Sequence, residues 1–301
     1  DLLEESDYQA KERKGEHVGP EDIQKAIDLK RWLSGRTQEQ IEEAIERGLI
    51  LLDTHQKVVG QINGVSVFST GEFEFGRPHR ITAQVGMGNS SLLDIEREAD
   101  FGGPTHTKGV LILKSFLTGR YAKKYPLAFS ASLGFEQSYS PIEGDSASAA
   151  EVCALLSAMA NVPLRQDLGV TGSVNQRGEI QPIGGVNAKI EGFFQACTVK
   201  GLTGSQGMVI PKANCDHLML RQDVLDAVDR DEFHIYSVET VDDVIEILSG
   251  MEAGQEDDNG SFPENSFNGR VIQGIRQTAE RWRELGEEFS SASGKDKKPL
   301  A

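Results

Sequence analysis

Ser146 and its neighbours have the residue types that a nucleophilic site needs. Ser146 stands in Glu143-Gly144-Asp145-Ser146-Ala147-Ser148, at the junction between a loop and a predicted helix. Backbone N–H groups and the positive end of a helix dipole at such a junction can stabilise an alkoxide or an oxyanion. The same residues also suit a plain helix N-cap, because Asp and Ser are common capping residues. The motif therefore predicts either a nucleophile or a cap.

Lys189 supplies a base for such a hydroxyl. It lies in the helix predicted after Gly184-Gly185, at roughly 40° from Phe193 on a helical wheel with about 100° per residue. This places Lys189 at the edge of an apolar stripe, where burial can lower the pKa of an amine by up to ~3–5. The alternative is a lysine whose stem packs while its ammonium group reaches water. The apolar stripe itself consists of Val186, Ile190, Phe193, Phe194 and Cys197.

Other catalytic patterns fit less well. The α/β-hydrolase nucleophile elbow requires G-x-S-x-G, but Ser148 stands at the last glycine position. Trypsin-like enzymes also use Gly-Asp-Ser, yet the helix predicted from Ala147 to Met159 contradicts their all-β fold. Six histidines leave a triad open, although His79 and His106 stand in no recognisable catalytic context. There is no G-x-x-x-x-G-K-[ST] phosphate loop.

The elements around these residues predict an α+β domain over residues 50–250, with mixed β-sheets and packed helices. Residues 50–100 read as a twisted β-meander, with strands over 58–68 and 80–87 and turns at Asn63-Gly64, Thr70-Gly71 and Gly76-Arg77-Pro78. Further helices are predicted over 108–123, 147–159, after Gly185, near 215–228 and over 241–248. Further strands are predicted over 127–135, 207–211 and 233–238. A hairpin is predicted in which 168–174 pairs with 179–183.

The strand over 127–135 has two different faces. Leu127, Phe129 and Leu133 alternate with Ser130, Ser132 and other small residues, so one face belongs to the core. The small and polar face suggests a place where an extended substrate adds as a strand.

Helical segments flank this domain. Residues 1–49 are helical and charged, with one helix starting at Gly19-Pro20 and a second that Thr37 is expected to cap. Residues 251–301 combine an acidic linker over 251–269, an amphipathic helix and a disordered tail. The stripe of that helix, Val271, Ile272, Ile275, Trp282 and Leu285, must be buried against the domain or a neighbouring subunit.

Composition narrows the class of protein. Thirty-one basic and 47 acidic residues give a net charge of −16, which disfavours nucleic acid as a partner. No apolar run reaches the ~18–20 residues of a membrane span, and no signal peptide is recognisable, so we expect no membrane association. Three distant cysteines, Cys153, Cys197 and Cys215, fit a reducing cytoplasm. The chain begins at Asp1 without Met, which suggests a piece of something longer.

Several motifs, in order, resemble the proteolytic domain of the Lon family, in the branch whose nucleophile motif reads Glu-Gly-Asp-Ser-Ala-Ser. The interval of 43 residues between Ser146 and Lys189 is also the one that the family uses. The resemblance covers about residues 50–250. Its motifs are Phe135-Glu136-Gln137-Ser138-Tyr139, Glu143–Ser148, Val170-Thr171-Gly172-Ser173-Val174, Gly184-Gly185-Val186-Asn187-Ala188-Lys189 and Ile210-Pro211.

The resemblance implies a serine endopeptidase with a Ser-Lys dyad. Ser146 would be the nucleophile and Lys189 the general base, with Thr171 orienting the lysine unless it is only a strand-forming residue. Asp145 and Glu143 match acidic positions near the site. Because a carboxylate beside Lys189 would raise its pKa, we interpret both as gating or resting-state groups, or simply as a helix cap.

The resemblance also implies partners outside this chain. Residues 1–49 look like the end of the small helical subdomain of an AAA+ ATPase, so ATP and Mg²⁺ would act in an upstream module, with no cofactor in this chain. A hexameric ring and unfolded or damaged protein substrates follow from the same likeness, and the cytoplasmic location expected from the cysteines is compatible with them. The competing hypothesis is a non-catalytic module that assembles a ring or recruits clients through the helix over 270–289. A serine hydrolase acting on small esters is a third reading.

Overall fold

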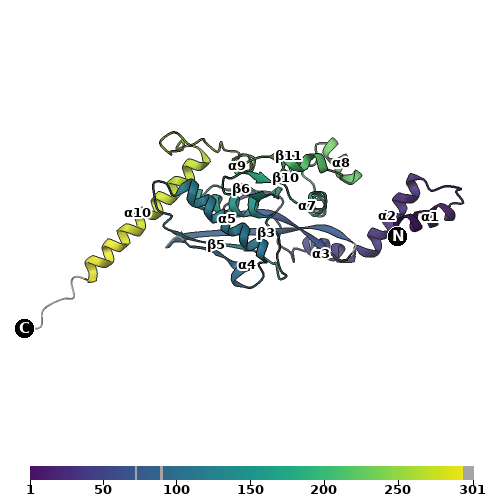
Figure 1. Cartoon of the computed structure of the whole chain (residues 1–301), viewed down its shortest axis with the longest axis horizontal. Coiled ribbons are helices and arrows are strands. Elements are labelled where there is room, and N and C mark those ends of the chain that lie inside the picture. Colours follow the sequence, from purple (N-terminus) through teal and green to yellow (C-terminus); the bar gives the residue numbers. More distant parts are fainter. Residues whose placement is uncertain (72, 89–90, 294–301) are drawn as a thin grey trace, which may run out of the picture.

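A mixed seven-stranded sheet lies at the centre of the chain, between two layers of helices (Figure 1). The computed structural model describes residues 1–71, 73–88 and 91–293. The strand order is β11-β10-β7-β2-β3-β5-β4. The strands are β2 (Gln61–Ser69), β3 (Glu74–Met87), β4 (Ser91–Asp94), β5 (Phe129–Phe135), β7 (Leu168–Val170), β10 (Gly207–Pro211) and β11 (His234–Val238).

Alternation along the strands divides the core in two. On β10, Val209 packs with one group of helices, whereas Met208 and Ile210 pack with the other, because successive side chains point to opposite faces. One face is covered by α5 (Pro104–Tyr121), α6 (Ser148–Ala160), α9 (Val241–Ser249) and α10 (Phe267–Ser293). The other face is covered by α7 (Val186–Lys200) and α8 (Gln222–Asp229). The predicted α+β class, with a mixed sheet and packed helices, is confirmed.

Two predicted turns are wrong, because they lie inside strands. Asn63-Gly64 belongs to β2 and Gly76-Arg77-Pro78 to β3, and these two strands pair without interruption from Gln61 to Ser69. Pro78 is tolerated because β5 pairs with β3 only from Ile81 onwards, so the missing N–H faces no strand on that side. Of the three predicted turns, only Thr70-Gly71 falls where the chain reverses.

The segment over 168–183 also differs from the predicted hairpin. β7 joins the main sheet, and the hairpin consists only of β8 (Ser173–Val174) and β9 (Ile180–Gln181). The strands separate at Thr171-Gly172, where Thr171 donates its N–H to Val209 of β10. Thr171 is therefore not the mid-strand residue that the sequence indicated, but stands where β7 ends.

Three further predictions need correction. β5 is paired with β3 on one edge and with β4 on the other, so it offers no free edge to a substrate strand over Ser130–Leu133. The single helix expected near 215–228 is a 3₁₀ turn, η1 (Lys212–His217), followed after a break by α8. α5 begins at Pro104 rather than 108, because proline suits the first turn of a helix.

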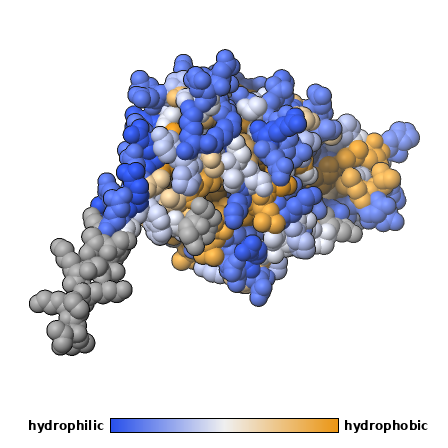
Figure 2. Space-filling view, turned by 60° about the vertical axis from the view of Figure 1, so that its left-hand side comes forward, coloured by the Kyte–Doolittle hydropathy of each residue, from blue (hydrophilic) through white to orange (hydrophobic). Residues whose placement is uncertain are grey.

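Three helices precede the sheet: α1 (Leu2–Glu12), α2 (Pro20–Ser34) and α3 (Arg36–Glu46). α2 starts at Gly19-Pro20 as predicted, but Thr37 does not cap α3. Gly35 joins the two helices directly, which places Thr37 inside α3. α3 packs against α7 through Ile45 and Ala196. Apolar surface gathers at the end of the molecule that the N-terminal helices form, and includes exposed Leu3, Tyr8, Trp32 and Leu33 (Figure 2).

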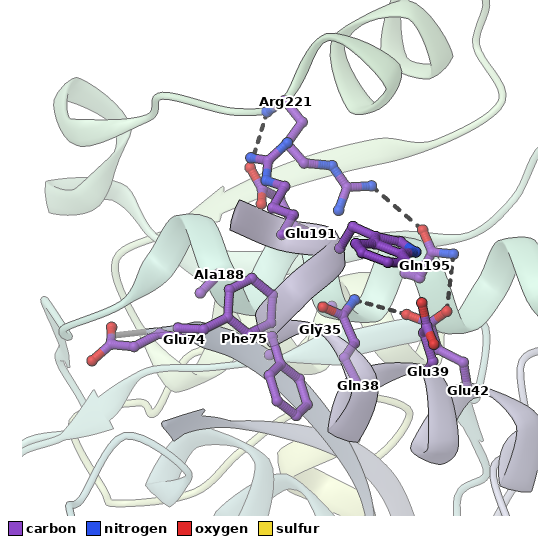
Figure 3. Close-up of a pocket in the computed structure, with 15 residues that line it drawn as sticks. Gly35, Gln38, Glu39, Glu42, Glu74, Phe75, Ala188, Glu191, Gln195 and Arg221 are labelled. Atoms are coloured by element: carbon purple, nitrogen blue, oxygen red, sulfur yellow. Dashed lines mark hydrogen bonds between the residues drawn. The ribbon is translucent and has the colours of Figure 1, made fainter. Parts of the chain in front are cut away.

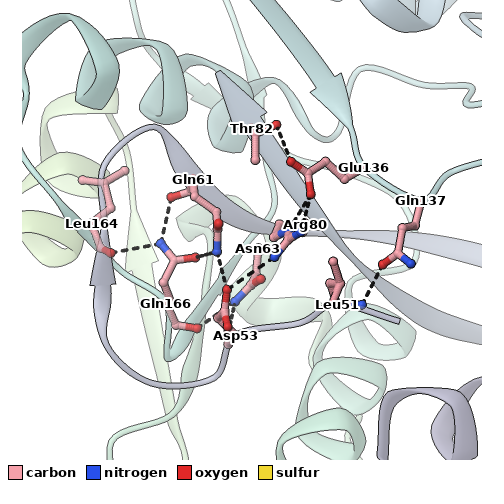
Figure 4. Close-up of polar contacts among 10 residues, drawn as sticks. All are labelled: Leu51, Asp53, Gln61, Asn63, Arg80, Thr82, Glu136, Gln137, Leu164 and Gln166. Carbon is pink, nitrogen blue, oxygen red and sulfur yellow. Dashed lines mark hydrogen bonds and ion pairs between the residues drawn. The ribbon is translucent and has the colours of Figure 1, made fainter. Parts of the chain in front are cut away.

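A polar network holds the chain after α3 against the sheet (Figure 4). The amide of Asn63 donates to the carbonyl oxygens of Asp53 and Gln166, both at 2.7 Å. The side chain of Gln137 accepts from the N–H of Leu51 at 2.6 Å and donates to the carbonyl oxygen of Leu49 at 2.8 Å. Residues 49–53 are thereby fixed both to β2 and to the loop that follows β5.

The C-terminal helix is integral to the fold over its first half. Phe267, Val271 and Ile275 are buried in the main core, as the predicted amphipathic stripe requires. The second half projects from the body, and Trp282 is 50% exposed (Figure 1). The predicted disordered tail falls mostly on residues 294–301, which lie outside the described residues. The remaining short elements are α4 (Ile95–Glu98), β1 (Lys57–Val58) and β6 (Leu164–Arg165).

Ile275→Ala should lower the free energy of unfolding by about 2–5 kcal/mol, because it leaves a cavity in the core. Trp282→Ala should lower it by less than about 1 kcal/mol, because that side chain already contacts solvent. Urea denaturation of both variants measures the difference. Equal losses would contradict the packing of α10 described above.

Candidate active site

Ser146, Thr171 and Lys189 meet where the three layers of the fold converge. Ser146 precedes α6, Thr171 follows β7 in the sheet, and Lys189 lies in the first turn of α7. The Lys189 Nζ donates to the Ser146 Oγ at 2.6 Å and to the Thr171 Oγ1 at 3.1 Å. The structure thus brings together three of the five residues that the sequence singled out, at hydrogen-bonding distance.

The loop before α6 is fixed by contacts with the end of β7. The Ser146 carbonyl oxygen accepts from the Gly172 N–H at 2.8 Å and from the Thr171 Oγ1 at 3.1 Å. The Ser148 hydroxyl closes the first turn by donating to the Asp145 carbonyl oxygen at 2.6 Å. Thr171 therefore binds both partners of the pair, the lysine amine and the serine backbone.

Asp145 does not cap α6, whose N-cap residue is Ala147 and makes no side-chain capping bond. The Asp145 carboxylate instead accepts from the Ser173 hydroxyl at 2.8 Å. It lies close enough to Lys189 for its charge to act on the amine. The capping interpretation of Asp145 is therefore wrong for this helix.

Two backbone features fix the start of α7. Gly185, its N-cap, has a φ of 67°, a left-handed conformation that glycine adopts without strain. Gly76 of β3 and Gly192 of α7 let strand and helix touch, since a Cβ on Gly192 would lie 2.1 Å from the Gly76 carbonyl oxygen. Lys189 thus projects from a helix that packs directly on the sheet. The close contact of the two backbones fixes where the lysine side chain begins.

Burial has the largest effect on the pKa of the Lys189 amine. The residue is 2% exposed, so its head does not reach bulk water as a snorkelling lysine would. Burial lowers the pKa of Lys189 to about 8, against the nearby charge of Asp145, which raises it. The predicted placement at the edge of an apolar stripe is confirmed.

A cavity of about 510 Å³ opens beside Ser146 and Lys189. One wall carries His79, whose Nε2 is 2.7 Å from the Ser66 Oγ. Burial lowers the pKa of His79 to about 3, with the charge of Arg77 acting in the same direction, so its imidazole is neutral. This wall was not predicted, because Pro78 suggests a turn in the sequence; the β-branched and aromatic residues on both sides of it were the available signal for a strand.

Glu143 also lines the cavity, but its carboxylate faces the beginning of α5. It accepts from the Thr105 N–H at 3.2 Å. Its contacts with Thr105 lower the pKa of Glu143, as expected for a carboxylate at a helix N-terminus. Of the roles considered for Glu143, this geometry suits a helix cap, for α5 rather than α6.

A buried polar cluster lies beneath α6 and was not singled out from the sequence. Glu151 of α6 is fully buried, and burial raises its pKa to about 7. The His106 Nδ1 is 3.6 Å from Glu151, and its Nε2 is 3.4 Å from Asp94. Burial lowers the pKa of His106, but the neighbouring carboxylates outweigh it and raise the pKa overall. A lone glutamate among the apolar residues 147–159 was the only signal for this cluster.

A second cavity, of about 290 Å³, lies on the other side of α7 (Figure 3). Gln195 bridges its walls, with the amide at 3.4 Å from Glu42 of α3 and the carbonyl oxygen at 3.4 Å from Arg221. In the described part of the chain, no three His, Cys, Asp or Glu side chains are arranged to hold a metal ion. Neither finding adds a reactive group to the site at Ser146.

Comparison with known proteins agrees with the fold. Residues 135–250 match the family described as the Lon protease (S16) C-terminal proteolytic domain. A "Putative Lon protease homolog" of Escherichia coli is 43% identical over 239 residues, which cover 79% of this chain and 41% of that protein. One from Haemophilus influenzae is 41% identical over 242 residues, covering 79% and 40%. An archaeal Lon protease of Thermococcus kodakarensis is 38% identical over 144 residues, covering 48% and 20%.

The mixed sheet with its packed helices is an α+β domain, and residues 135–250 of it match a proteolytic-domain family. The chain carries a Lon-type (S16) C-terminal proteolytic domain, to which Ser146, Thr171 and Lys189 all belong. The matched part spans about two fifths of the first two relatives. Over the described residues, no helix is both long and apolar enough to cross a membrane.

The Lys189 amine should make stability depend on pH. Its pKa falls from 10.5 to about 8 in the folded chain, so between these values the unfolded chain holds a proton that the folded chain has lost. The free energy of unfolding should therefore rise with pH in this window, by up to about 3 kcal/mol. Urea denaturation of wild type and Lys189→Met, from pH 7 to 10.5, isolates the contribution. The Lys189→Met variant should gain most in free energy of unfolding over the wild type near pH 7, where burying the charged amine costs the wild type most. A difference between the two chains that is the same at every pH would contradict the assignment.

Proposed function

We propose that this chain is the proteolytic part of a serine endopeptidase that cleaves peptide bonds with a Ser146–Lys189 dyad. The observation that carries the proposal is the 2.6 Å contact between the Lys189 Nζ and the Ser146 Oγ. The amine is buried and its pKa is about 8, close to the value that a general base needs near neutral pH. A lysine with its ordinary pKa of 10.5 would hold its proton and could not activate the hydroxyl.

In the proposed reaction, the neutral Lys189 amine takes the Ser146 proton as the Oγ attacks the carbonyl carbon of the substrate. The resulting ammonium group gives this proton to the leaving amine, and an acyl-enzyme remains. Lys189 then takes a proton from the water that attacks the ester, and returns it to the Ser146 Oγ as the bond to the acyl group breaks and the acid leaves. Backbone N–H groups directly before α6 are the proposed donors to the oxyanion, because those of Ser148 and Ala149 are bonded to the carbonyl oxygens of Asp145 and Gly172. Thr171 holds the amine in place throughout.

Asp145 is proposed to set the resting state. Its charge favours the ammonium form of Lys189, and its own oxygen is held by Ser173 at 2.8 Å. At neutral pH the amine is then mostly protonated, and losing that proton precedes each turnover. Glu143 is proposed to act only through α5, since its carboxylate contacts that helix.

The activity of the whole protein is proposed from its longer relatives. Because the first two relatives are more than twice as long as the matched part, we propose an upstream AAA+ module that uses ATP and Mg²⁺ to deliver unfolded or damaged proteins. We further propose a hexameric ring in the cytoplasm and membership of the branch with the Glu-Gly-Asp-Ser-Ala-Ser motif. Exposed apolar residues on α1 and α2 suit a contact with such a module.

A non-catalytic recruiting module is less well supported. Recruitment through residues 270–289 would need the apolar stripe of α10 to be accessible, but Val271 and Ile275 are buried within the chain itself. Trp282 stays exposed and is the residue on which such a role would depend. The dyad geometry has no purpose in that hypothesis.

Ser146→Ala and Lys189→Ala should each reduce the cleavage of casein or of a fluorogenic peptide by a factor of about 10³ or more, because the residues act as one unit. The double variant should be no slower than either single variant. Lys200→Ala, which removes an exposed lysine from the same helix, should keep full activity. Activity retained in Ser146→Ala or Lys189→Ala, with a folded protein by circular dichroism, would refute the dyad.

The rate should follow the neutral form of Lys189. Below its pKa of about 8 the fraction of neutral amine falls about tenfold for each pH unit, so kcat/KM should fall with it and level off above pH 8. Initial rates from pH 6 to 9.5 measure this profile. A rate that is flat from pH 7 to 9 would show that another group acts as the base.

A further inference from the structure

Two buried polar groups on the wall of the cavity beside Ser146 have no hydrogen-bond partner within the described residues. They are the Arg77 Nε and the Ser138 Oγ. Arg77 belongs to β3, and Ser138 follows β5 and is 7% exposed. Both residues line the cavity together with Ser146 and Lys189. A buried donor without an acceptor is costly, so such groups call for a partner that the free chain lacks.

Arg77 is unusual among the arginines of this strand. Arg80 lies three positions further along and forms an ion pair with Glu136. Arg77 forms no ion pair over the described part of the chain; its guanidinium donates to the Gln137 carbonyl oxygen across 3.5 Å, at the limit of a hydrogen bond. This bond brings it to the residue directly before Ser138, so both donors serve one part of the cavity wall.

Arg77 carries a permanent positive charge, and no neighbouring side chain in the described part of the chain neutralises this charge. Burial lowers the pKa of the guanidinium, but an arginine does not lose its proton at physiological pH. His79 beside it is neutral. Of the acids that line the cavity, Glu143 is engaged at the beginning of α5. Glu74 is exposed at the rim.

We infer that Arg77 and Ser138 form a subsite for a carboxylate of the substrate. A guanidinium fork with a hydroxyl matches the oxygen atoms of a carboxylate, which accepts several hydrogen bonds at once. The carboxylate comes either from an acidic side chain near the cleaved bond or from a peptide C-terminus, including the one that cleavage creates. The inference rests on the proposed function for the bond that is cut, but the binding of a carboxylate does not require hydrolysis.

Binding to the full chain carrying Ser146→Ala tests the subsite without turnover. The probes are fluorescein-labelled, C-terminally amidated octapeptides in which a single Glu or Gln is moved through every position, and one uncharged peptide with a free C-terminal carboxylate. Fluorescence anisotropy should give about tenfold tighter binding for Glu than for Gln at one position, or for the free carboxylate over its amide, because charge-assisted hydrogen bonds are the stronger kind. The two groups of peptides identify the source of the carboxylate.

Arg77→Gln in the same background should abolish this preference, while Arg77→Lys should keep part of it because the charge remains. Arg47→Gln is the matched control, since it removes one positive charge from an exposed position outside the cavity. A purely structural role for Arg77, holding the loop through Gln137, would instead weaken all peptides equally and lower the melting temperature of the chain.

The outcomes separate this inference from the proposed function. Equal binding of Glu and Gln peptides at every position, together with equal binding of acid and amide, overturns the subsite even if the wild-type chain hydrolyses peptides. A preference that survives in Arg77→Gln overturns it as well. A preference that depends on Arg77, in a chain whose wild type cleaves nothing, supports the subsite and refutes the endopeptidase.

Discussion

The site depends on burying an amine next to a hydroxyl. Removing a lysine head from water is unfavourable for its charged form, so the fold must supply both the burial and the groups that receive the amine. Thr171 and Ser146 are those groups, at 3.1 and 2.6 Å. The burial comes from α7, which rests on β3 at Gly76 and Gly192, where no side chain separates the two backbones. A helix seated farther from the sheet would give its lysine room to reach solvent.

The rest of the structure serves this placement. α6 is buried along almost its whole length, so the loop before it begins from a rigid support. The end of β7 then joins that loop to the helix on the other face, through the two bonds of Thr171. Because serine, threonine and lysine come from three different layers, their distances depend on the packing of the whole core. The site and the stability of the fold are therefore difficult to change independently.

Local pattern made Ser146 and Lys189 candidates, since helical periodicity places Lys189 beside the apolar stripe of α7, but it left a helix cap and a solvent-reaching lysine open. Their pairing as a dyad followed from the resemblance to the Lon family. The sequence also predicted the mixed class of the fold, and most helices within a few residues. What it could not predict depends on contacts between distant segments. Pro78 reads as a turn unless one knows that β5 stops short of it, and β5 reads as a free strand unless one knows that β4 covers its other edge.

The same limit applies to the cavity wall. Arg77 and His79 carry no local signature, and Ser138 stands in a motif of the resemblance that assigns it no role. Only the pairing of β3 with β2 and β5 brings the three beside Ser146. For Glu143 and Asp145 the local pattern is present but misleading. Their residue types suggest a cap of the following helix, α6, which neither carboxylate caps. Their carboxylates are engaged by Thr105 and Ser173, partners that no sequence spacing indicates.

Gln137 contacts two regions at once. Its side chain is bonded to Leu51, just after the N-terminal helices (Figure 4), and to the Leu49 carbonyl oxygen. Its own carbonyl oxygen is the one that Arg77 contacts. The Gln137 backbone has a φ of 56°, in the left-handed region. A small rotation of the Gln137 backbone would therefore move both its side chain and its carbonyl oxygen. A displacement of the segment that follows α3 would therefore act on the wall of the cavity through Gln137. This gives the N-terminal helices a hydrogen-bonded connection to the place where substrate would lie.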